Sequence, residues 1–356
     1  MSTTGTTINP CPVIQSALNQ WFQTCPASRR PQTPTLIWSN SEVNKSGINQ
    51  VIQPTRGKKR TVELVFTQPA PTSDVTTVAD CDKVCDATTE QGDEVVQYTI
   101  ECTDGQRIER KVRLSDWNES CKADGQIILD TLVNMLDGLI PAIAEKQATE
   151  LNPLLGNWSS DVDPAWLSVD QFLEVATKDA NGKVDFQWLE RFDLAKQMTG
   201  YCAPSLVTGG SDLYSAWRLV NAGCCTNDGL DALSLVDQFG QAVVWDRYIA
   251  NEFGNDVSLL LQSNSIQLLN VVWNTPMLEL GGFVDLDLTY RNGFQTVVAD
   301  PVTGILVDLN IKEDCGVVHI VMTATTKTVG LPNNLYPAGH PLEFVTFANG
   351  IQVVNP

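Results

Sequence analysis

The sequence predicts an α+β fold, and three observations in its 356 residues lead to that prediction. A single long helical stretch occupies residues 121–156. Polar, strand-like runs precede it, and a block of shorter helices followed by a block of strands comes after it. Runs of helices and runs of strands that do not alternate regularly are typical of α+β proteins.

The long helix is predicted by apolar residues that recur at steps of three and four. Such steps place one apolar stripe along a helix of about five to six turns, at about 1.5 Å per residue. Pro141 lies inside the stretch and predicts a kink or a break there. The stripe consists of Ile128, Leu132, Leu136, Leu139, Ile140, Ile143, Ala144 and Ala148.

Residues 1–50 are predicted to form an N-terminal arm. Prolines at positions 10, 12, 26, 31 and 34 are spaced by Ser and Thr, which favours extended chain. Residues 13–22 predict one short helix within the arm. A terminal segment of this kind becomes ordered when something holds it, and a neighbouring subunit could do so.

Residues 51–122 predict an extended hairpin with its flanking strands. Residues 60–67, 94–102 and 107–114 alternate apolar and polar side chains, as half-buried strands do. Asp104–Gly105 predicts a tight turn that joins the second and third of these strands. The polar stretch 68–92 would form the tip of a projecting loop, because its few apolar residues cannot cover both faces of a sheet.

The remainder of the chain predicts four helices and then strands. The expected helices are residues 168–178, 186–199, 212–222 and 233–252. The expected strands are residues 266–273, 282–290, 294–299, 305–311 and 317–325. Asp300-Pro301-Val302-Thr303-Gly304 predicts a hairpin loop between two of them. Six tryptophans of this part, at positions 158, 166, 188, 217, 245 and 273, are predicted to be core and interface aromatics.

Charge is unevenly distributed over the chain, whose formal net charge is −19. Residues 1–122 hold 13 Lys and Arg and 14 Asp and Glu, whereas the remainder holds 10 and 28. An acidic body repels nucleic acid and membrane phosphates, so neither sequence-specific DNA binding nor membrane binding is expected. The first residues lack a secretory signal pattern, which predicts a protein that arises in a cytoplasm.

No pattern in the sequence predicts an enzyme or a cofactor. The only histidines are His319 and His340, and neither lies in a recognisable nucleophile motif. Residues 177–186 resemble a calcium loop in the middle, with Asp179, Asn181 and Gly182, but lack the acidic ligands at both ends. A turn between two helices is the alternative explanation. Cys81 and Cys85 have no paired CxxC knuckle nearby, which argues against zinc.

Two clusters of basic residues are the candidate inter-subunit contacts. They stand out in an acidic chain, one at the start of the first hairpin strand and the other on a later strand, without the interleaved aromatics that single-stranded nucleic acid would need. Contact with the acidic body of another copy explains them as a head-to-tail interface, and a solvated hairpin face is the alternative. The residues are Arg56, Lys58, Lys59, Arg60, Arg107, Arg110, Lys111 and Arg113.

In the order of its elements, the chain resembles a major capsid protein of a tailed bacteriophage with the Hong Kong 97-like fold. The resembling elements are the arm, the hairpin as an E-loop, the long helix as a spine, and the α+β body. The run QTVVADPVTGILVDL at residues 295–309 is similar to hairpins in some phage capsid proteins, and residues 314–316 and 263–269 add to the similarity. Pro141 departs from an unbroken spine.

The resemblance implies a non-enzymatic shell subunit that assembles into hexamers and pentamers of an icosahedral head enclosing DNA. It implies a spine helix at 123–160, a mainly axial (A) domain at 161–293, peripheral (P) strands at 294–330 and a C-terminal A/P segment at 331–356. Expected partners are other copies and portal, scaffold or decoration proteins, in a virion assembled in the host cytoplasm. The alternatives are a tail, connector or encapsulin-like component, and a soluble calcium-binding module.

Overall fold

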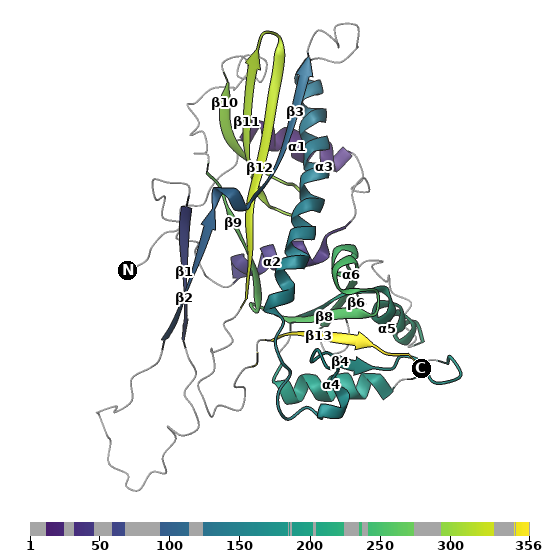
Figure 1. Cartoon of the computed structure of the whole chain (residues 1–356). Coiled ribbons are helices and arrows are strands. Elements are labelled where there is room, and N and C mark those ends of the chain that lie inside the picture. The colour runs from purple at the N-terminus through teal and green to yellow at the C-terminus, as the bar shows by residue number, and fades with distance from the viewer. Residues whose placement is uncertain are drawn as a thin grey trace, which may run out of the picture. The chain divides into compact units, whose positions relative to one another are not determined.

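The computed structural model describes residues 12–24, 32–45, 59–67, 93–113, 124–183, 185, 187–201, 204–223, 235–236, 241–273, 293–330, 345 and 347–355. The chain forms two compact units, each built from segments distant in sequence. The first consists of residues 1–62, 99–147 and 268–328, and the second of residues 63–98, 148–267 and 329–356. The fold is therefore α+β, as the sequence predicts (Figure 1).

The first unit is organised around an antiparallel sheet with the strand order β10-β11-β12-β3. Its strands are β10 (Phe294–Ala299), β11 (Leu306–Asp314), β12 (Val317–Gly330) and β3 (Gly105–Arg113). A further strand, β9 (Ile266–Val271), also pairs with β12. The predicted loop after β10 is confirmed, because the Asp300 carboxylate accepts hydrogen bonds from both the amide and the hydroxyl of Thr303.

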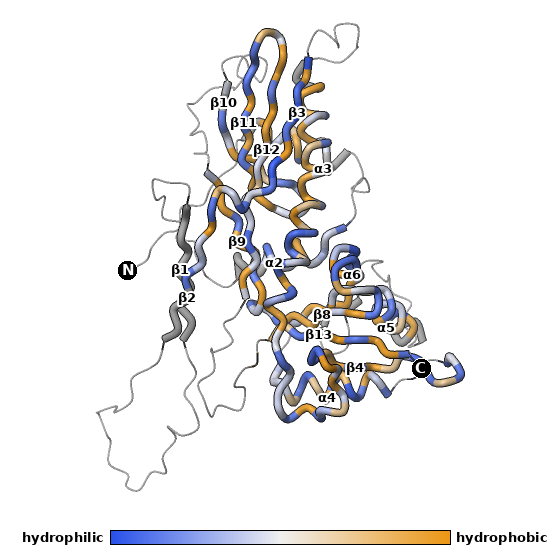
Figure 2. The backbone as a smooth tube through the Cα atoms, viewed as in Figure 1, coloured by the Kyte–Doolittle hydropathy of each residue, from blue (hydrophilic) through white to orange (hydrophobic). Residues whose placement is uncertain are grey.

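Strand β12 shows why the sheet has one buried face. Its residues Val318, Ile320, Met322 and Ala324 are fully buried, whereas the residues between them are half-exposed. Because successive side chains of a strand point to opposite faces, this alternation gives one face to the core and one to solvent. Figure 2 shows the same alternation as hydrophobic and hydrophilic bands along β11 and β12.

Helix α3 (Asp124–Leu151) has 28 residues and confirms the predicted long helix. Its apolar stripe is buried, and a Cβ added at Gly138 would lie 3.4 Å from Ile108 of β3. The predicted break at Pro141 is wrong: the helix continues through it, since Leu139, Ile140 and Ile143 around the proline are all buried. By length and composition residues 127–154 could cross a membrane, but 56% of that window is buried, as in the core helix of a soluble protein.

Two helices precede the hairpin. Helix α1 (Pro12–Thr24) confirms the short helix predicted in the arm, whereas α2 (Pro34–Lys45) falls where extended chain was predicted. Both belong to the first unit and contact its β10 strand and following loop: the Gln15 side-chain amide donates to the Ala299 carbonyl, and that of Asn40 donates to the Thr303 carbonyl. The expectation of an extended arm is therefore wrong for α2, which buries Leu36 within its own chain.

The hairpin consists of β1 (Lys59–Thr67) and β2 (Asp93–Glu101), which pair in a two-stranded sheet as predicted. The predicted turn at Asp104–Gly105 does not join two paired strands. Residues Cys102–Asp104 form a single 3-10 turn, in which the Glu101 amide donates to Asp104 Oδ2, and β3 then pairs with β12 instead of β2. Residues 68–92, with Cys81 and Cys85, lie outside the described part of the chain.

The second unit contains a six-stranded mixed sheet with helices. The strand order is β4-β13-β8-β5-β7-β6. The strands are β4 (Leu173–Val175), β5 (Ser205–Gly209), β6 (Leu235–Val236), β7 (Gln241–Trp245), β8 (Val257–Gln262) and β13 (Ala348–Val353). The helices are α4 (Gln187–Thr199), α5 (Ser211–Gly223) and α6 (Arg247–Phe253).

Buried aromatic residues hold this second unit together. The rings of Trp188 and Trp217 lie 5.6 Å apart, and Trp158 donates through Nε1 to the Gly350 carbonyl at 3.2 Å. These three tryptophans are buried, as predicted for core aromatics, whereas Trp245 is 47% exposed, so that an interface position remains a prediction for it. Helices α4 and α5 confirm the predictions for residues 186–199 and 212–222.

Two helix predictions in this unit are wrong. Residues 168–178 form a tight turn and strand β4, whose buried Leu173 and Val175 pair with the distant strand β13. Residues 233–252 are split between β6, β7 and α6, because Asp246 caps α6 by accepting a hydrogen bond from the Tyr248 amide. The predicted strand at 282–290 lies outside the described residues.

Candidate functional site

Strand β3 carries four of the eight basic residues that the sequence singles out. Arg107, Arg110, Lys111 and Arg113 are all exposed on this strand. β3 stands at the end of the strand order in its sheet, paired with β12 on one side. Lys59 and Arg60 belong to β1, but their side chains, together with Arg56 and Lys58, fall outside what the structure describes. The structure therefore describes the side chains of the β3 cluster only, which are Arg107, Arg110, Lys111 and Arg113.

The basic residues of β3 divide between the two faces of the strand. Val112 is buried and shares its face with Arg110, whereas Arg107, Lys111 and Arg113 alternate onto the solvent face. An ion pair of 2.5 Å joins Arg107 to Glu109, and both side chains are more than half exposed. Exposed pairs of this kind contribute little to stability.

The register of the sheet adds two residues that the sequence analysis did not select. Lys111 is paired with His319 of β12, and His319 in turn is paired with Lys312 of β11. Two lysines therefore flank a histidine in one cross-strand row. The two lysines carry positive charge on both sides of the histidine, so the row attracts an anionic partner.

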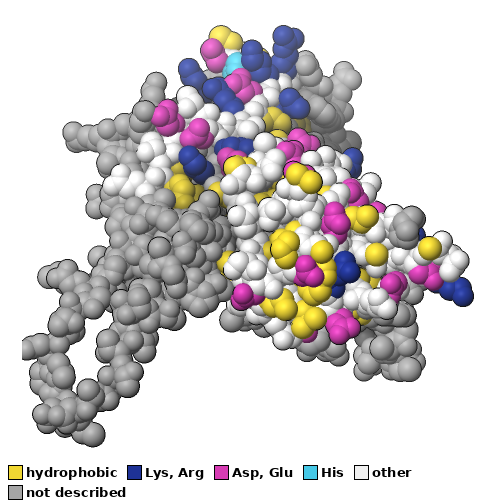
Figure 3. Space-filling model, turned by 60° about the horizontal axis from the view of Figure 1, so that its bottom comes forward, with side chains coloured by type: hydrophobic (Ala, Val, Ile, Leu, Met, Phe, Trp, Pro, Cys, Tyr) yellow, Lys and Arg dark blue, Asp and Glu magenta, His cyan; other side chains and the backbone are white. Residues whose placement is uncertain are grey.

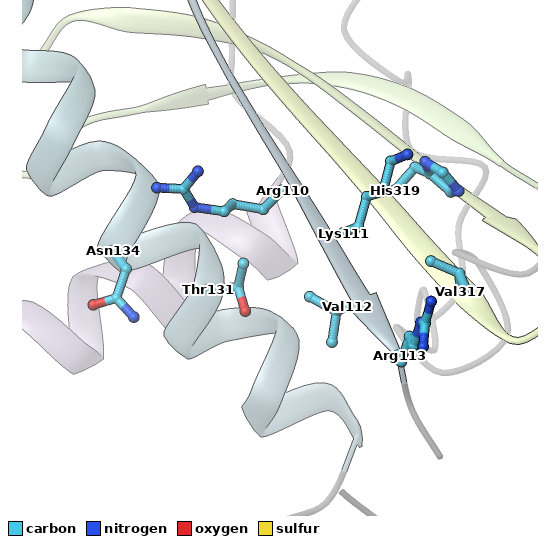
Figure 4. A pocket seen from close by; sticks show the side chains of 8 residues that line it. All are labelled: Arg110, Lys111, Val112, Arg113, Thr131, Asn134, Val317 and His319. Atoms are coloured by element: carbon cyan, nitrogen blue, oxygen red, sulfur yellow. The ribbon is translucent and has the colours of Figure 1, made fainter. Parts of the chain in front are cut away.

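A hollow of about 670 Å³ lies beside this row. It is lined by Arg110, Lys111, Val112 and Arg113 of β3, by Thr131 and Asn134 of α3, and by Val317 and His319 of β12. Figure 4 shows Arg110 and Val112 on the side of β3 that faces α3, and Lys111 beside His319 on the other side. We call these lining residues the basic hollow.

The chemistry of the basic hollow suits a carboxylate ligand. Its lining has three cationic side chains, two polar side chains, one histidine, two valines and no acidic side chain, and Val317 is the valine that is not buried. Figure 3 shows Lys and Arg side chains gathered beside a histidine on the surface. A second hollow of about 750 Å³ shares His319 and includes Lys312, but Asp314 also lines it, which lowers its affinity for anions.

The other candidate sites have structural explanations. Asp179 Oδ1 accepts hydrogen bonds from the amides of Asn181 and Lys183, at 2.9 and 2.8 Å. The Lys183 amide is the main reason that the pKa of Asp179 is lowered. The segment is therefore a turn, between β4 and α4 rather than between two helices. In the described ranges, no three His, Cys, Asp or Glu side chains lie together as metal ligands would.

Among described cysteines, Cys102 and Cys315 are exposed thiols that form no disulfide. Cys102 lies in the 3-10 turn after β2, and Cys315 lies in the turn between β11 and β12, where its φ is 50°. Neither has a histidine partner in the contacts of the structure. These positions support neither zinc ligation nor nucleophilic catalysis.

No protein-family model and no curated protein matches the chain. Among solved structures, the chain is similar to the capsid asymmetric unit of cyanophage Pam1, with 8% identity, a TM-score of 0.43, and coverage of 85% of this chain and 87% of that chain. It is also similar to the capsid of Ralstonia phage GP4, with 9% identity, a TM-score of 0.41 and coverage of 86% and 87%. The capsid structure of cyanophage P-SCSP1u matches with 8% identity, a TM-score of 0.40 and coverage of 85% of each chain.

Proposed function

We propose that this chain is a major capsid protein, a structural subunit that assembles into hexamers and pentamers of an icosahedral phage head. The observation that carries the proposal is the combination of a 28-residue helix, a sheet built on it, and a separate two-stranded hairpin in one chain. A two-stranded hairpin is marginal by itself in water and needs a partner surface. A shell of identical subunits supplies that surface on a neighbouring copy.

Within this proposal the parts of the chain take the roles that the resemblance implies. Residues 1–50 act as an N-terminal arm that is partly helical, residues 51–122 as the E-loop, and residues 123–160 as the spine. Residues 161–293 form most of the axial domain, residues 294–330 the peripheral strands, and residues 331–356 the C-terminal segment. What supports the grouping of the spine with the peripheral strands is that α3 up to Gln147 and strands β10 and β11 fall in the same compact unit.

Strand β3 and the basic hollow form an inter-subunit contact in this proposal. The chain after residue 122 is strongly acidic, so a basic strand on one copy and an acidic surface on the next are electrostatically complementary. Contacts between different surfaces of identical subunits are heterologous, and they form a ring, as a capsomer requires, when the rotation between subunits closes. The packaged DNA would be enclosed without sequence-specific contacts, and scaffold, portal or decoration proteins would complete the virion.

Sedimentation and negative-stain imaging of the purified full-length chain, alone and with a phage scaffold protein, test the proposal. We expect species far larger than the 39.0 kDa chain, with closed shells among them. Rings or tubes without closed shells would indicate another virion component. A chain that stays monomeric under all these conditions would refute the proposal.

A further inference from the structure

Among the described residues of the second unit, the most exposed large apolar side chain lies at the tip of a small turn. Val169 is 98% exposed, although its neighbours Leu167 and Leu173 are at least partly buried and pair across the base of the turn. We call residues 167–173 the Val169 knob. An isolated exposed valine is ordinary, but this one occupies a turn with a fixed shape.

Hydrogen bonds hold that shape. The Gln171 amide donates to the Ser168 carbonyl at 3.0 Å, and the Ser168 amide donates to the Phe172 carbonyl at 2.8 Å. The Ser168 hydroxyl accepts a further bond from the Phe172 amide at 3.1 Å. Gln171 has a φ of 62°, a conformation that costs free energy for a residue with a side chain. A rigid turn that presents Val169 and Asp170 loses little entropy on binding.

The surroundings of the Val169 knob are acidic. Between Lys146 and Lys178 the sequence contains five acidic residues and no Lys, Arg or His. Asp161, Asp163 and Asp170 of this stretch are exposed. The only nearby guanidinium in the described contacts belongs to Arg191, which is engaged by the Trp166 ring and the Glu174 carbonyl.

The knob and the basic hollow are complementary in both charge and polarity. The knob offers one apolar side chain followed by one carboxylate. The hollow offers half-exposed Val317 beside Lys111 and Arg113, and its lining contains no acidic side chain. We propose that the Val169 knob of one copy docks into the basic hollow of a second copy. Val169 then packs against Val317, and the Asp170 carboxylate pairs with Lys111 or Arg113, which lie on the same face of the sheet as Val317.

This inference rests on the proposed function, because it names the partner segment of the interface assigned there. It is more specific than general charge attraction. The charge pair speeds encounter and fixes register, and the apolar contact beside it adds buried apolar area. A second copy is favoured over a nucleic acid because the lining of the hollow contains no Phe, Tyr or Trp on which bases could stack.

Photo-cross-linking in assembled particles tests the contact directly. Full-length chains with Val169→benzoylphenylalanine are assembled from an equal mixture of ¹⁴N- and ¹⁵N-labelled protein, irradiated, digested and analysed by mass spectrometry. We expect mixed-isotope cross-links from the knob to residues 107–113 or 312–319. The matched control is Leu219→benzoylphenylalanine, at an apolar position that is 57% exposed on α5. It should not reach those residues.

If every cross-linked product carries a single isotope, the knob contacts its own chain and not a second copy. That result would overturn the proposal. Cross-links to other regions, or none in well-formed particles, would overturn it as well. Failure of the unmodified chain to form any particle would instead count against the proposed function. The two outcomes are therefore distinguishable.

A charge swap gives an independent test. Asp170→Lys and Lys111→Glu should each raise the critical concentration for assembly about threefold or more, and the double variant should return to within about twofold of the unmodified chain. Glu190→Lys, the same charge change at an exposed position of α4, is the control and should have a smaller effect. A double variant that assembles no better than the worse single variant would contradict the contact.

Discussion

Lys146 of helix α3 connects three elements of the first unit, and its replacement should be costly. Its ammonium donates to the Asp104 carbonyl at 2.7 Å and to the Thr326 carbonyl at 2.5 Å. One contact reaches the 3-10 turn at the base of the hairpin, and the other reaches β12. The substitution Lys146→Met keeps most of the aliphatic side chain and removes the ammonium group that donates both hydrogen bonds.

The expected loss follows from the number and type of these bonds. A hydrogen bond to a charged group contributes about 1.5–3 kcal/mol. Lys146 is half-buried, so water can hydrate the two carbonyls in part once the ammonium is gone. The lower end of this energy range therefore applies to each bond. We therefore expect Lys146→Met to lower the free energy of unfolding by about 2–4 kcal/mol, because two backbone carbonyls lose their charged donor.

Chemical denaturation of the unassembled protein at low concentration measures this loss. The matched control is Lys327→Met. Lys327 also donates to a backbone carbonyl near the hairpin, that of Thr99, but through one bond of 3.2 Å at an exposed position. Its loss should be about 0.5 kcal/mol or less. Equal losses for the two variants, or less than about 1 kcal/mol for Lys146→Met, would refute the reasoning.

Three further outcomes are expected, all measurable by denaturation. Leu136→Ala should cost about 2–5 kcal/mol, since this α3 side chain is fully buried, and a loss under 1 kcal/mol would show that α3 does not pack as described. Gly210→Ala should cost about 1–3 kcal/mol or more, because the new Cβ would lie 2.0 Å from the Asn255 carbonyl oxygen; unchanged stability would contradict that close approach. Burial raises the pKa of Tyr201 well above its ordinary value, so the folded state keeps a proton that the unfolded state releases above about pH 10. The contribution of Tyr201 to the free energy of unfolding should be fully present below that pH and decrease as pH rises toward the pKa of the folded state. Tyr201→Phe should remove this pH-dependent decrease.

The predictable parts of the fold are those with strong local periodicity. The α3 stripe and the alternation in β12 carry their own burial pattern, so the sequence alone predicts both. The hairpin strands and the loop at Asp300 likewise rest on local signals. Pro141 misled the prediction because the cost of a proline in a helix is offset by buried neighbours on both sides, which local reasoning does not include.

The errors occur where a distant partner decides the structure. Residues 168–178 have helix-compatible spacing, but β4 obtains its partner from β13, nearly two hundred residues away. Asp104–Gly105 has the composition of a hairpin turn, yet β3 leaves β2 and pairs with β12. Local turn chemistry cannot distinguish these outcomes, because it does not specify which strand completes the pairing.

The candidate site was predictable only in part for the same reason. The basic residues of β3 stand out in an acidic chain, so composition finds them. His319 and Lys312 join Lys111 only through the register of three strands, and the hollow needs Thr131 and Asn134 of α3 as well. No sequence signal placed these residues together.

The central claim is that copies of this chain complete one another in a closed shell. A cryo-electron microscopy reconstruction of particles assembled from the full-length chain tests it most directly. We predict an icosahedral shell in which strand β3 and the β1–β2 hairpin of each copy contact a neighbouring copy. Particles in which both elements contact only their own chain, or a protein that forms no particles, would contradict the claim.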